Sequence, residues 1–151
     1  MVHNERVSYF AAVFARTPQG WLGTEAALAE AESVDDIADQ MREAAVESYG
    51  DAVVLLVEQE DDWFAIVRLD GDDEPRAYVS AVRDDPLAGL FLPLVGDAPD
   101  GDPSGDASLL TDLGVDAGQI AELGERALPG DALLTIAERV GFGEEFDRLR
   151  D

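Results

Sequence analysis

The sequence predicts an α+β fold in which an antiparallel sheet of about five strands is joined by one helix and a helical C-terminal tail. The main observation is the stretch from Ala52 to Val82, where two acidic turns separate three runs of β-branched and aromatic residues. That composition is typical of a three-stranded meander. A second observation is the spacing of apolar residues, which changes from two to about 3.6 at Ser33 and becomes helical again beyond residue 106.

The first predicted element is an N-terminal hairpin. Residues 1–7 are polar, include the single histidine His3, and are expected to be a loose head. Val7 to Arg16 alternates as a strand does, and TPQG follows it. Pro and Gly favour a turn there, so Trp21 to Leu28 is predicted to return as the second strand.

A helix is predicted after the hairpin. Ser33 is the expected N-cap, and Asp36 follows three residues later as in a capping box. Gly50 is expected to end the helix. Its apolar stripe comprises Val34, Ile37, Ala38, Met41, Ala45 and Tyr49.

The first two meander strands carry apolar side chains on both faces. In the first run, Val53, Leu55 and Val57 are expected on one face and Val54 and Leu56 on the other. In the second run, one face is expected to carry Trp63, Ala65, Val67 and Leu69, and the opposite face Phe64, Ile66 and Arg68. Such a sheet must be covered twice. We expect the helix after the hairpin to cover one face and the C-terminal tail to cover the other.

The second half of the chain is predicted to be a connection, a linker and a helical tail. Asp84 to Val95 is either a short helix or a packed connection, and residues 96–105 (GDAPDGDPSG) have the composition of an acidic Pro/Gly linker. The predicted helical pieces of the tail are Ser108–Leu113, Ala117–Arg126 after a capping box of Asp116 and Gln119, Ala132–Val140 after Asp131, and Glu144–Arg150. We expect one domain, 1–151, in which 8–95 form the sheet and helix and 106–151 pack on the sheet.

Charge is the strongest compositional feature, because 34 acids face 10 bases for a net charge of −24. All the bases are Arg. Such a field repels nucleic-acid phosphates and anionic membranes, so we expect neither as a direct partner. The natural complement is a basic protein surface, and the alternative is that the charge serves only solubility. With no Cys in the chain, a cytoplasmic location is expected.

No catalytic, cofactor-binding or metal-binding residues are predicted. A zinc deaminase site needs His and Cys ligands that the chain lacks, and a Ser-His-Asp relay needs a positioned imidazole, whereas His3 lies in the loose head. Gly141 to Gly143 (GFG) follows a helix, so it is interpreted as a helix end and a tight turn and not as a dinucleotide fingerprint.

Two acidic clusters have some features of metal sites. Asp100, Asp102 and Asp106 resemble part of a calcium loop, but the twelfth place holds Thr111 and not Glu. Turn chemistry explains a second cluster, which comprises Asp70, Asp72, Asp73 and Glu74. Two adjacent pairs, Asp61 with Asp62 and Asp84 with Asp85, carry no specific signal.

Three further side chains are of types that often take part in binding. Trp21 and Trp63 each begin a predicted strand, and each is either a packing residue or an interface anchor. Arg68 lies on a strand among acids. It is predicted to form a structural ion pair.

Four segments in order resemble the actinobacterial family of tRNA adenosine deaminase-associated proteins. They are SYFAAVFARTPQGW, LLVEQEDDWFAIVRLDGDDEPRAYVS, LLTDLGVDA and LPGDALLTIAERVGFGEEFDRLR. The resemblance runs from Ser8 over nearly the whole chain and implies a link to the tRNA-editing deaminase. It carries no catalytic motif, so it implies a process and a partner but no site residues.

The leading hypothesis is a non-catalytic accessory protein that binds and modulates a tRNA adenosine deaminase through its acidic surface. One alternative is a metal-dependent enzyme or regulator built from carboxylates alone. The other is a structural module that buries a sheet face in a homodimer.

Overall fold

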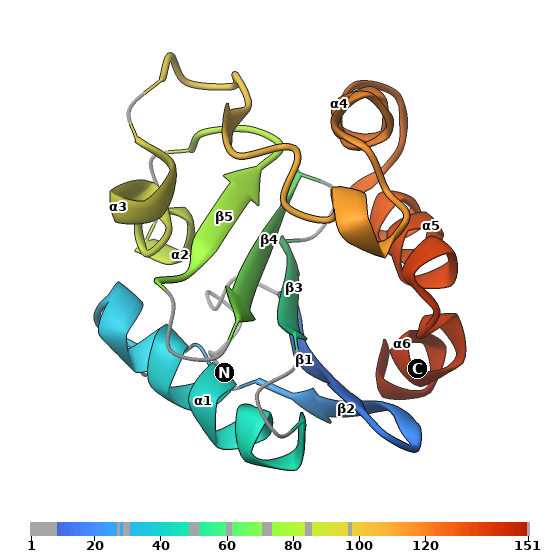
Figure 1. Ribbon diagram of the computed structural model, residues 1–151. Helices are drawn as coiled ribbons and strands as arrows, with labels where there is room; N and C mark the ends of the chain where they lie inside the picture. Colours follow the sequence, from blue (N-terminus) through green and yellow to red (C-terminus); the bar gives the residue numbers. More distant parts are fainter. Residues whose placement is uncertain are drawn as a thin grey trace, which may run out of the picture.

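The computed structural model describes residues 9–26, 28, 31–48, 52–59, 62–70, 74–83, 86–96 and 98–150. One sheet of six strands, in the order β2-β1-β3-β4-β5-β6, runs through the molecule (Figure 1). The strands are β1 (Phe10–Thr17), β2 (Gly20–Glu25), β3 (Ala52–Gln59), β4 (Trp63–Asp70), β5 (Arg76–Val79) and β6 (Ser104–Gly105). The expected loose head, including His3, lies outside the described residues.

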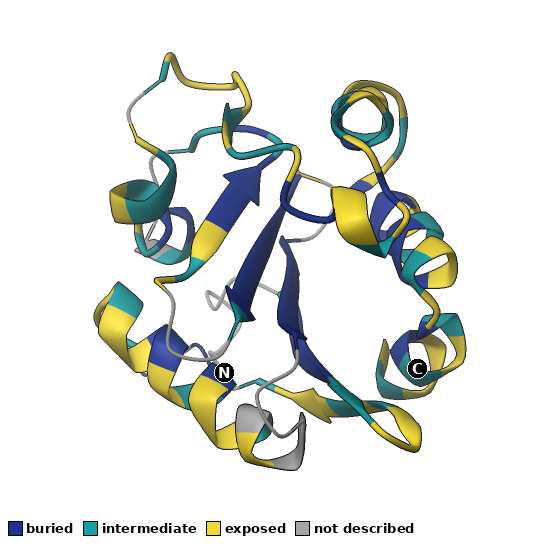
Figure 2. Cartoon of the chain, in the orientation of Figure 1, coloured by how far each residue is buried: buried dark blue, intermediate teal, exposed yellow. Residues whose placement is uncertain are grey.

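All neighbouring strands are antiparallel, which confirms the predicted hairpin and meander. In the register of β3 with β4, Ala52 lies opposite Asp70 and Gln59 opposite Trp63. β1 pairs with β3 as well as with β2. The hairpin is thereby joined to the meander, and β3 and β4 occupy the middle of the sheet, where almost every residue is buried (Figure 2).

Each face of the sheet has its own apolar core, as the alternation of residues predicts. One core, which also holds Ile37, Met41 and Phe91, includes Val53, Leu55 and Val57 of β3 and Trp63, Ala65, Val67 and Leu69 of β4. The other core includes Val54 and Leu56 of β3 and Phe64 and Ile66 of β4. Helices therefore lie on both sides of the sheet (Figure 1).

Helix α1 (Val34–Ser48) covers the first face. Ile37, Ala38 and Met41 are buried, as the apolar stripe predicts. At the start of the helix, the Asp36 carboxylate accepts a hydrogen bond of 2.8 Å from the Glu32 N–H. Two expected features, Tyr49 in the stripe and Gly50 at the helix end, lie outside the described residues.

The undecided stretch before the predicted linker forms two short helices. These are α2 (Pro86–Gly89) and α3 (Leu92–Val95). Phe91, between them, is fully buried in the core on the α1 side. The stretch is therefore both helical and packed, because its apolar residues finish the cover of the first face.

The C-terminal tail covers the second face, as predicted. Its elements are η1 (Thr111–Leu113), α4 (Ala117–Arg126), α5 (Pro129–Val140) and α6 (Gly143–Arg150). Asp116 and Gln119 form the predicted capping box, with both hydrogen bonds at 2.9 Å. The prediction that Asp131 opens the next helix was wrong, because Pro129 occupies the first turn of α5 and Asp131 already lies within it.

The predicted linker is held against the sheet. The Val82 N–H donates to the Asp102 carbonyl at 2.7 Å, and the Gly101 N–H donates to the Val82 carbonyl at 2.8 Å. Ser104 and Gly105 then form β6, which pairs with Val79 and Tyr78. The Pro- and Gly-rich composition predicts a linker, but it does not indicate that residues 104 and 105 pair with β5. None of the helices in the described part of the chain is long and apolar enough to cross a membrane.

Candidate functional site

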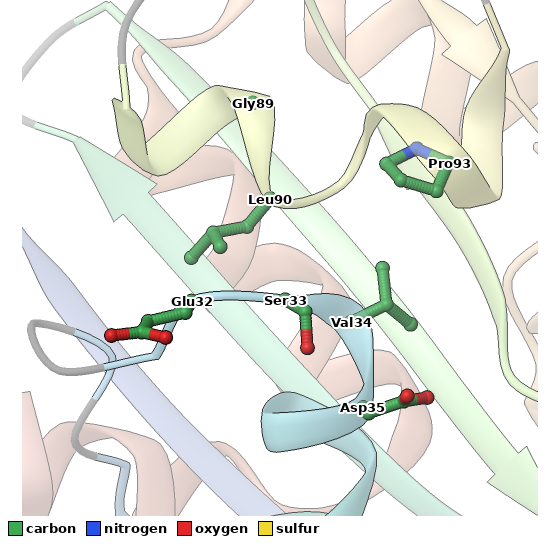
Figure 3. A pocket seen from close by; sticks show the side chains of 7 residues that line it. All are labelled: Glu32, Ser33, Val34, Asp35, Gly89, Leu90 and Pro93. Atoms are coloured by element: carbon green, nitrogen blue, oxygen red, sulfur yellow. The ribbon is translucent and has the colours of Figure 1, made fainter.

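One candidate site is a groove between the start of α1 and the α2–α3 region (Figure 3). Its volume is about 460 Å³, and it is lined by Glu32, Ser33, Val34, Asp35, Gly89, Leu90 and Pro93. Leu90 reaches toward the segment that enters α1, and Val34 points toward the segment that carries Pro93. The groove is formed by residues that lie more than fifty positions apart in the chain, so sequence reasoning missed it.

The lining of this groove combines apolar and anionic groups. Val34 and Leu90 are partly buried, whereas Glu32 and Asp35 are exposed. Such a lining suits an Arg or Lys side chain, whose aliphatic stem packs on apolar surface while its charged end meets carboxylates. The groove therefore offers both kinds of contact to a basic side chain.

A second hollow, of about 380 Å³, lies where α5 meets α6. Its lining is acidic and comprises Glu138, Gly141, Gly143, Glu144, Glu145 and Asp147. Gly141 ends α5 with a φ of 121°, so the interpretation of the GFG segment as a helix end is confirmed. A Cβ added at Gly141 would lie 3.6 Å from the Trp21 Nε1, which places β2 beside this hollow.

The two tryptophans have different surroundings. Trp63 is fully buried and packs edge-on against Phe91, with ring centroids 6.1 Å apart. The packing interpretation is therefore right for Trp63. Trp21 is partly exposed, lies 4.9 Å from the Phe142 ring, and has the Arg16 guanidinium 5.9 Å from its own ring. For Trp21 the role of interface anchor stays a prediction.

Arg68 forms the predicted structural ion pair. Its side chain is 7% exposed and donates two hydrogen bonds to Asp112, at 2.5 and 2.9 Å. It also donates to the Leu109 carbonyl at 2.9 Å and to Asp70 at 3.1 Å. The hydrogen bond to Asp112 raises the pKa of Arg68 against the opposing effect of burial, and the same bond lowers the pKa of Asp112.

The ion pairs continue from Arg68 to the residue that follows β6. Arg76 lies 3.5 Å from Asp70 and 3.5 Å from Asp106. Asp106 accepts hydrogen bonds of 2.6 and 3.0 Å from the Ser108 hydroxyl and N–H, and the bond from that hydroxyl is the main reason why its pKa is lowered. These contacts tie β4, β5 and the start of the tail together.

Two acids of the calcium-loop-like cluster form ion pairs or hydrogen bonds with neighbouring side chains. Asp106 is bound by Ser108 and Arg76, and Asp100 lies 3.6 Å from Arg83. No group of three or more His, Cys, Asp or Glu that could hold a metal ion occurs among the residues that the structure describes. The candidate residues Asp61, Asp72, Asp73, Asp84 and Asp85 lie outside them.

Sequence reasoning missed one buried ion pair. Glu58 on β3 is 6% exposed in its side chain and pairs with Arg150 at the end of α6. Its Oε2 accepts from the Arg150 Nη2 at 3.0 Å. The two residues lie 92 positions apart, and nothing in either local sequence indicates the pairing.

Comparisons with known proteins give one match. A family described as Rv3753c-like tRNA adenosine deaminase-associated protein matches residues 9–143. The comparison with curated proteins and the comparison with solved structures returned no match. Because the match covers most of the chain, the protein belongs to the Rv3753c-like tRNA adenosine deaminase-associated protein family.

Proposed function

We propose that this chain is a non-catalytic accessory protein that binds a tRNA adenosine deaminase through its acidic surface and modulates or stabilises that enzyme. The family description supplies the association with the deaminase. The net charge of −24 is the observation that supports the mode of binding. A cytoplasmic location belongs to the same proposal.

Ion pairs account for much of the arginine. Among the residues that the structure describes, six arginines pair with carboxylates: Arg42, Arg68, Arg76, Arg83, Arg126 and Arg150. Each ion pair is neutral as a whole and adds little to the field at a distance, which is set by the net charge of −24. The protein therefore attracts a positively charged partner.

An enzyme that acts on tRNA supplies such a partner. It must present cations to the phosphate backbone of its substrate, and the same cations attract a strongly anionic protein. In one version of the proposal, the acidic surface takes the place of the RNA backbone on the deaminase.

The test is binding of the purified deaminase across a salt series. We expect a complex at low ionic strength that weakens as the screening length falls from about 10 Å at 0.1 M to about 3 Å at 1 M salt. If the acidic surface occupies the RNA-binding surface, added tRNA will displace it. Absence of a complex even at low ionic strength would remove the proposal, and binding unaffected by salt would point to apolar contacts instead.

The two alternatives have separate tests. A carboxylate-based metal-dependent enzyme or regulator would melt at a higher temperature in calcium or magnesium, because a ligand of the folded state stabilises it. A homodimer would show twice the monomer mass by light scattering. Mutual repulsion between two chains of charge −24 opposes the dimer.

A further inference from the structure

Strand β2 forms the longer of the two edges of the sheet. It is first in the strand order, and in the part of the chain that the structure describes no strand pairs with its outer side. The opposite edge, β6, has only two residues, whereas β2 has six. An unpaired edge is a template for another strand.

The backbone groups available on this edge follow from the register. The Ala26 N–H donates to the Ala11 carbonyl at 2.9 Å, immediately beyond the pairing of Glu25 with Ala12. Hydrogen-bonded and non-bonded pairs alternate in an antiparallel ladder. Leu22 and Thr24 therefore bond to β1, and the N–H and C=O groups of Trp21, Gly23 and Glu25 point outward.

β2 has few of the features that usually protect an edge strand, since Glu25 is its one charged residue. Its sequence, GWLGTE, contains no Pro and no Lys, and its register with β1 runs without a bulge from Glu25 to Gly20. Leu22 is a large apolar residue that is 49% exposed. With so little protection, the charges and side chains around β2 decide which strand can pair with it.

Charge decides which strand fits. Glu25 is exposed on β2, and the acidic hollow at the α5–α6 junction lies beside Trp21. Arg16, over the Trp21 ring, is the basic group found close to it on the neighbouring strand. A second copy of this chain would bring another charge of −24 to the same place, so an added strand must be positively charged.

We propose that the outer edge of β2 docks an extended, positively charged segment of the partner deaminase, which joins the sheet as an additional strand. The inference rests on the proposed function for the identity of the partner. Main-chain hydrogen bonds to Trp21, Gly23 and Glu25 hold the segment, and its alternate side chains face opposite sides of the sheet.

The two sides differ in chemistry, which defines the segment further. On one side α6 packs over β2, since a Cβ at Gly23 would lie 3.0 Å from the Leu149 Cδ1. On this side the acidic hollow lies at the Trp21 end, whereas the last turn of α6 carries Arg148 and Arg150. On the other side Leu22 and Thr24 are exposed. The segment therefore places a basic residue toward the hollow beside Trp21 and apolar residues toward Leu22.

Amide hydrogen exchange measured by NMR, with and without the purified deaminase, tests the inference directly. In the free protein we expect fast exchange at Trp21, Gly23 and Glu25 and slower exchange at Leu22 and Thr24, which bond to β1. In the complex the three outward amides should slow by at least about tenfold, equivalent to about 1.4 kcal/mol. A complex in which these amides stay unprotected overturns the edge site and leaves the proposed function standing, whereas no complex at low salt removes both.

A pair of variants at one position separates backbone pairing from charge. Glu25→Pro removes an outward N–H, which an edge strand tolerates, and should weaken deaminase binding at least about tenfold. Glu25→Gln keeps the N–H and should weaken it by no more than about threefold. Equal affinities for Glu25→Pro and the parent chain contradict the inference.

A second variant covers the case in which Glu25→Pro does not fold. Leu22→Ser shortens an exposed side chain without changing the charge, so it leaves both the core and the electrostatic attraction intact. It should weaken binding at least about fivefold by removing the apolar contact on that side. Unchanged affinity of folded Leu22→Ser counts against the edge site. The matched control is Val46→Ser, which makes the same kind of change at an exposed position on α1 (71% exposed) and should bind as the parent chain does.

Discussion

Arg68 is a cation held on a buried strand by a carboxylate from the tail. Asp112→Asn replaces the charged partner of the guanidinium by a neutral one. We expect this change to lower the free energy of unfolding, measured in urea at pH 7, by about 1–2 kcal/mol. The value is at the low end for a charged hydrogen bond, because the Asp112 side chain is 64% exposed. Asp39→Asn, which alters an exposed pair with Arg42 at 3.6 Å, is the control and should change stability by less than about 0.5 kcal/mol.

The same pair predicts a dependence on pH. The pKa of Asp112 is lower in the folded protein than its ordinary value of 3.8. Asp112 therefore contributes fully to the free energy of unfolding at pH values above its pKa in the unfolded chain. This contribution is lost as the pH falls through its pKa in the folded protein. The stability difference between the parent chain and Asp112→Asn should thus shrink below about pH 4. A difference that stays constant from pH 7 to well below pH 4 would contradict the assignment to this carboxylate.

Glu58 is the buried partner of an exposed cation, so the two residues respond differently to substitution. Arg150→Leu leaves a carboxylate that is 6% exposed without its partner, and we expect a loss of about 1–3 kcal/mol of unfolding free energy. The double variant Glu58→Leu with Arg150→Leu removes both charges and should be more stable than Arg150→Leu alone. Equal stability of the single and double variants in thermal unfolding would show that the pair is not coupled.

At the scale of elements, β6 depends on one close backbone approach. Gly105 has a φ of +104°, and a Cβ there would lie 2.3 Å from the Ala77 carbonyl oxygen. Gly101 also has a positive φ, +92°, but its nearest neighbour is the Arg83 Nη1 at 3.3 Å. Gly105→Ala should therefore cost more than about 2 kcal/mol, and Gly101→Ala only the backbone strain of about 1 kcal/mol. Similar denaturation midpoints for the two variants would mean that β6 is not packed as described.

The strands and helices differ in how well the sequence predicts them. The alternation from Val53 to Leu69 is a local property, so it predicts both faces of the sheet and the need for two covers. The pairing of Ser104 and Gly105 with β5 is not local, and in a stretch such as GDAPDGDPSG nothing distinguishes Gly105 from Gly101. The signals that start a helix are also local in sequence, but Asp131 and Pro129 are both possible starts. The helix begins at Pro129, because the ring of proline fixes φ at a value that suits the first turn.

The candidate surfaces were harder to predict than the fold, for a physical reason. With 34 acids in the chain, adjacency in sequence says little about which carboxylates meet an arginine and which remain exposed. Arg68 selects Asp112, 44 positions away, and the groove brings Glu32 beside Leu90. Such choices are made by the tertiary packing of the two layers of helices on the sheet.

At the scale of the whole molecule, salt should act in opposite directions on folding and on binding. The folded chain has a net charge of −24, so repulsion between its carboxylates destabilises the compact state. Salt screens this repulsion. We therefore expect the melting temperature at pH 7 to rise between about 10 mM and 1 M NaCl. The complex with the deaminase depends on attraction, so over the same range its dissociation constant should increase. Thermal unfolding and binding titrations in matched buffers measure both, and a melting temperature that falls with salt would show that local ion pairs outweigh the general repulsion.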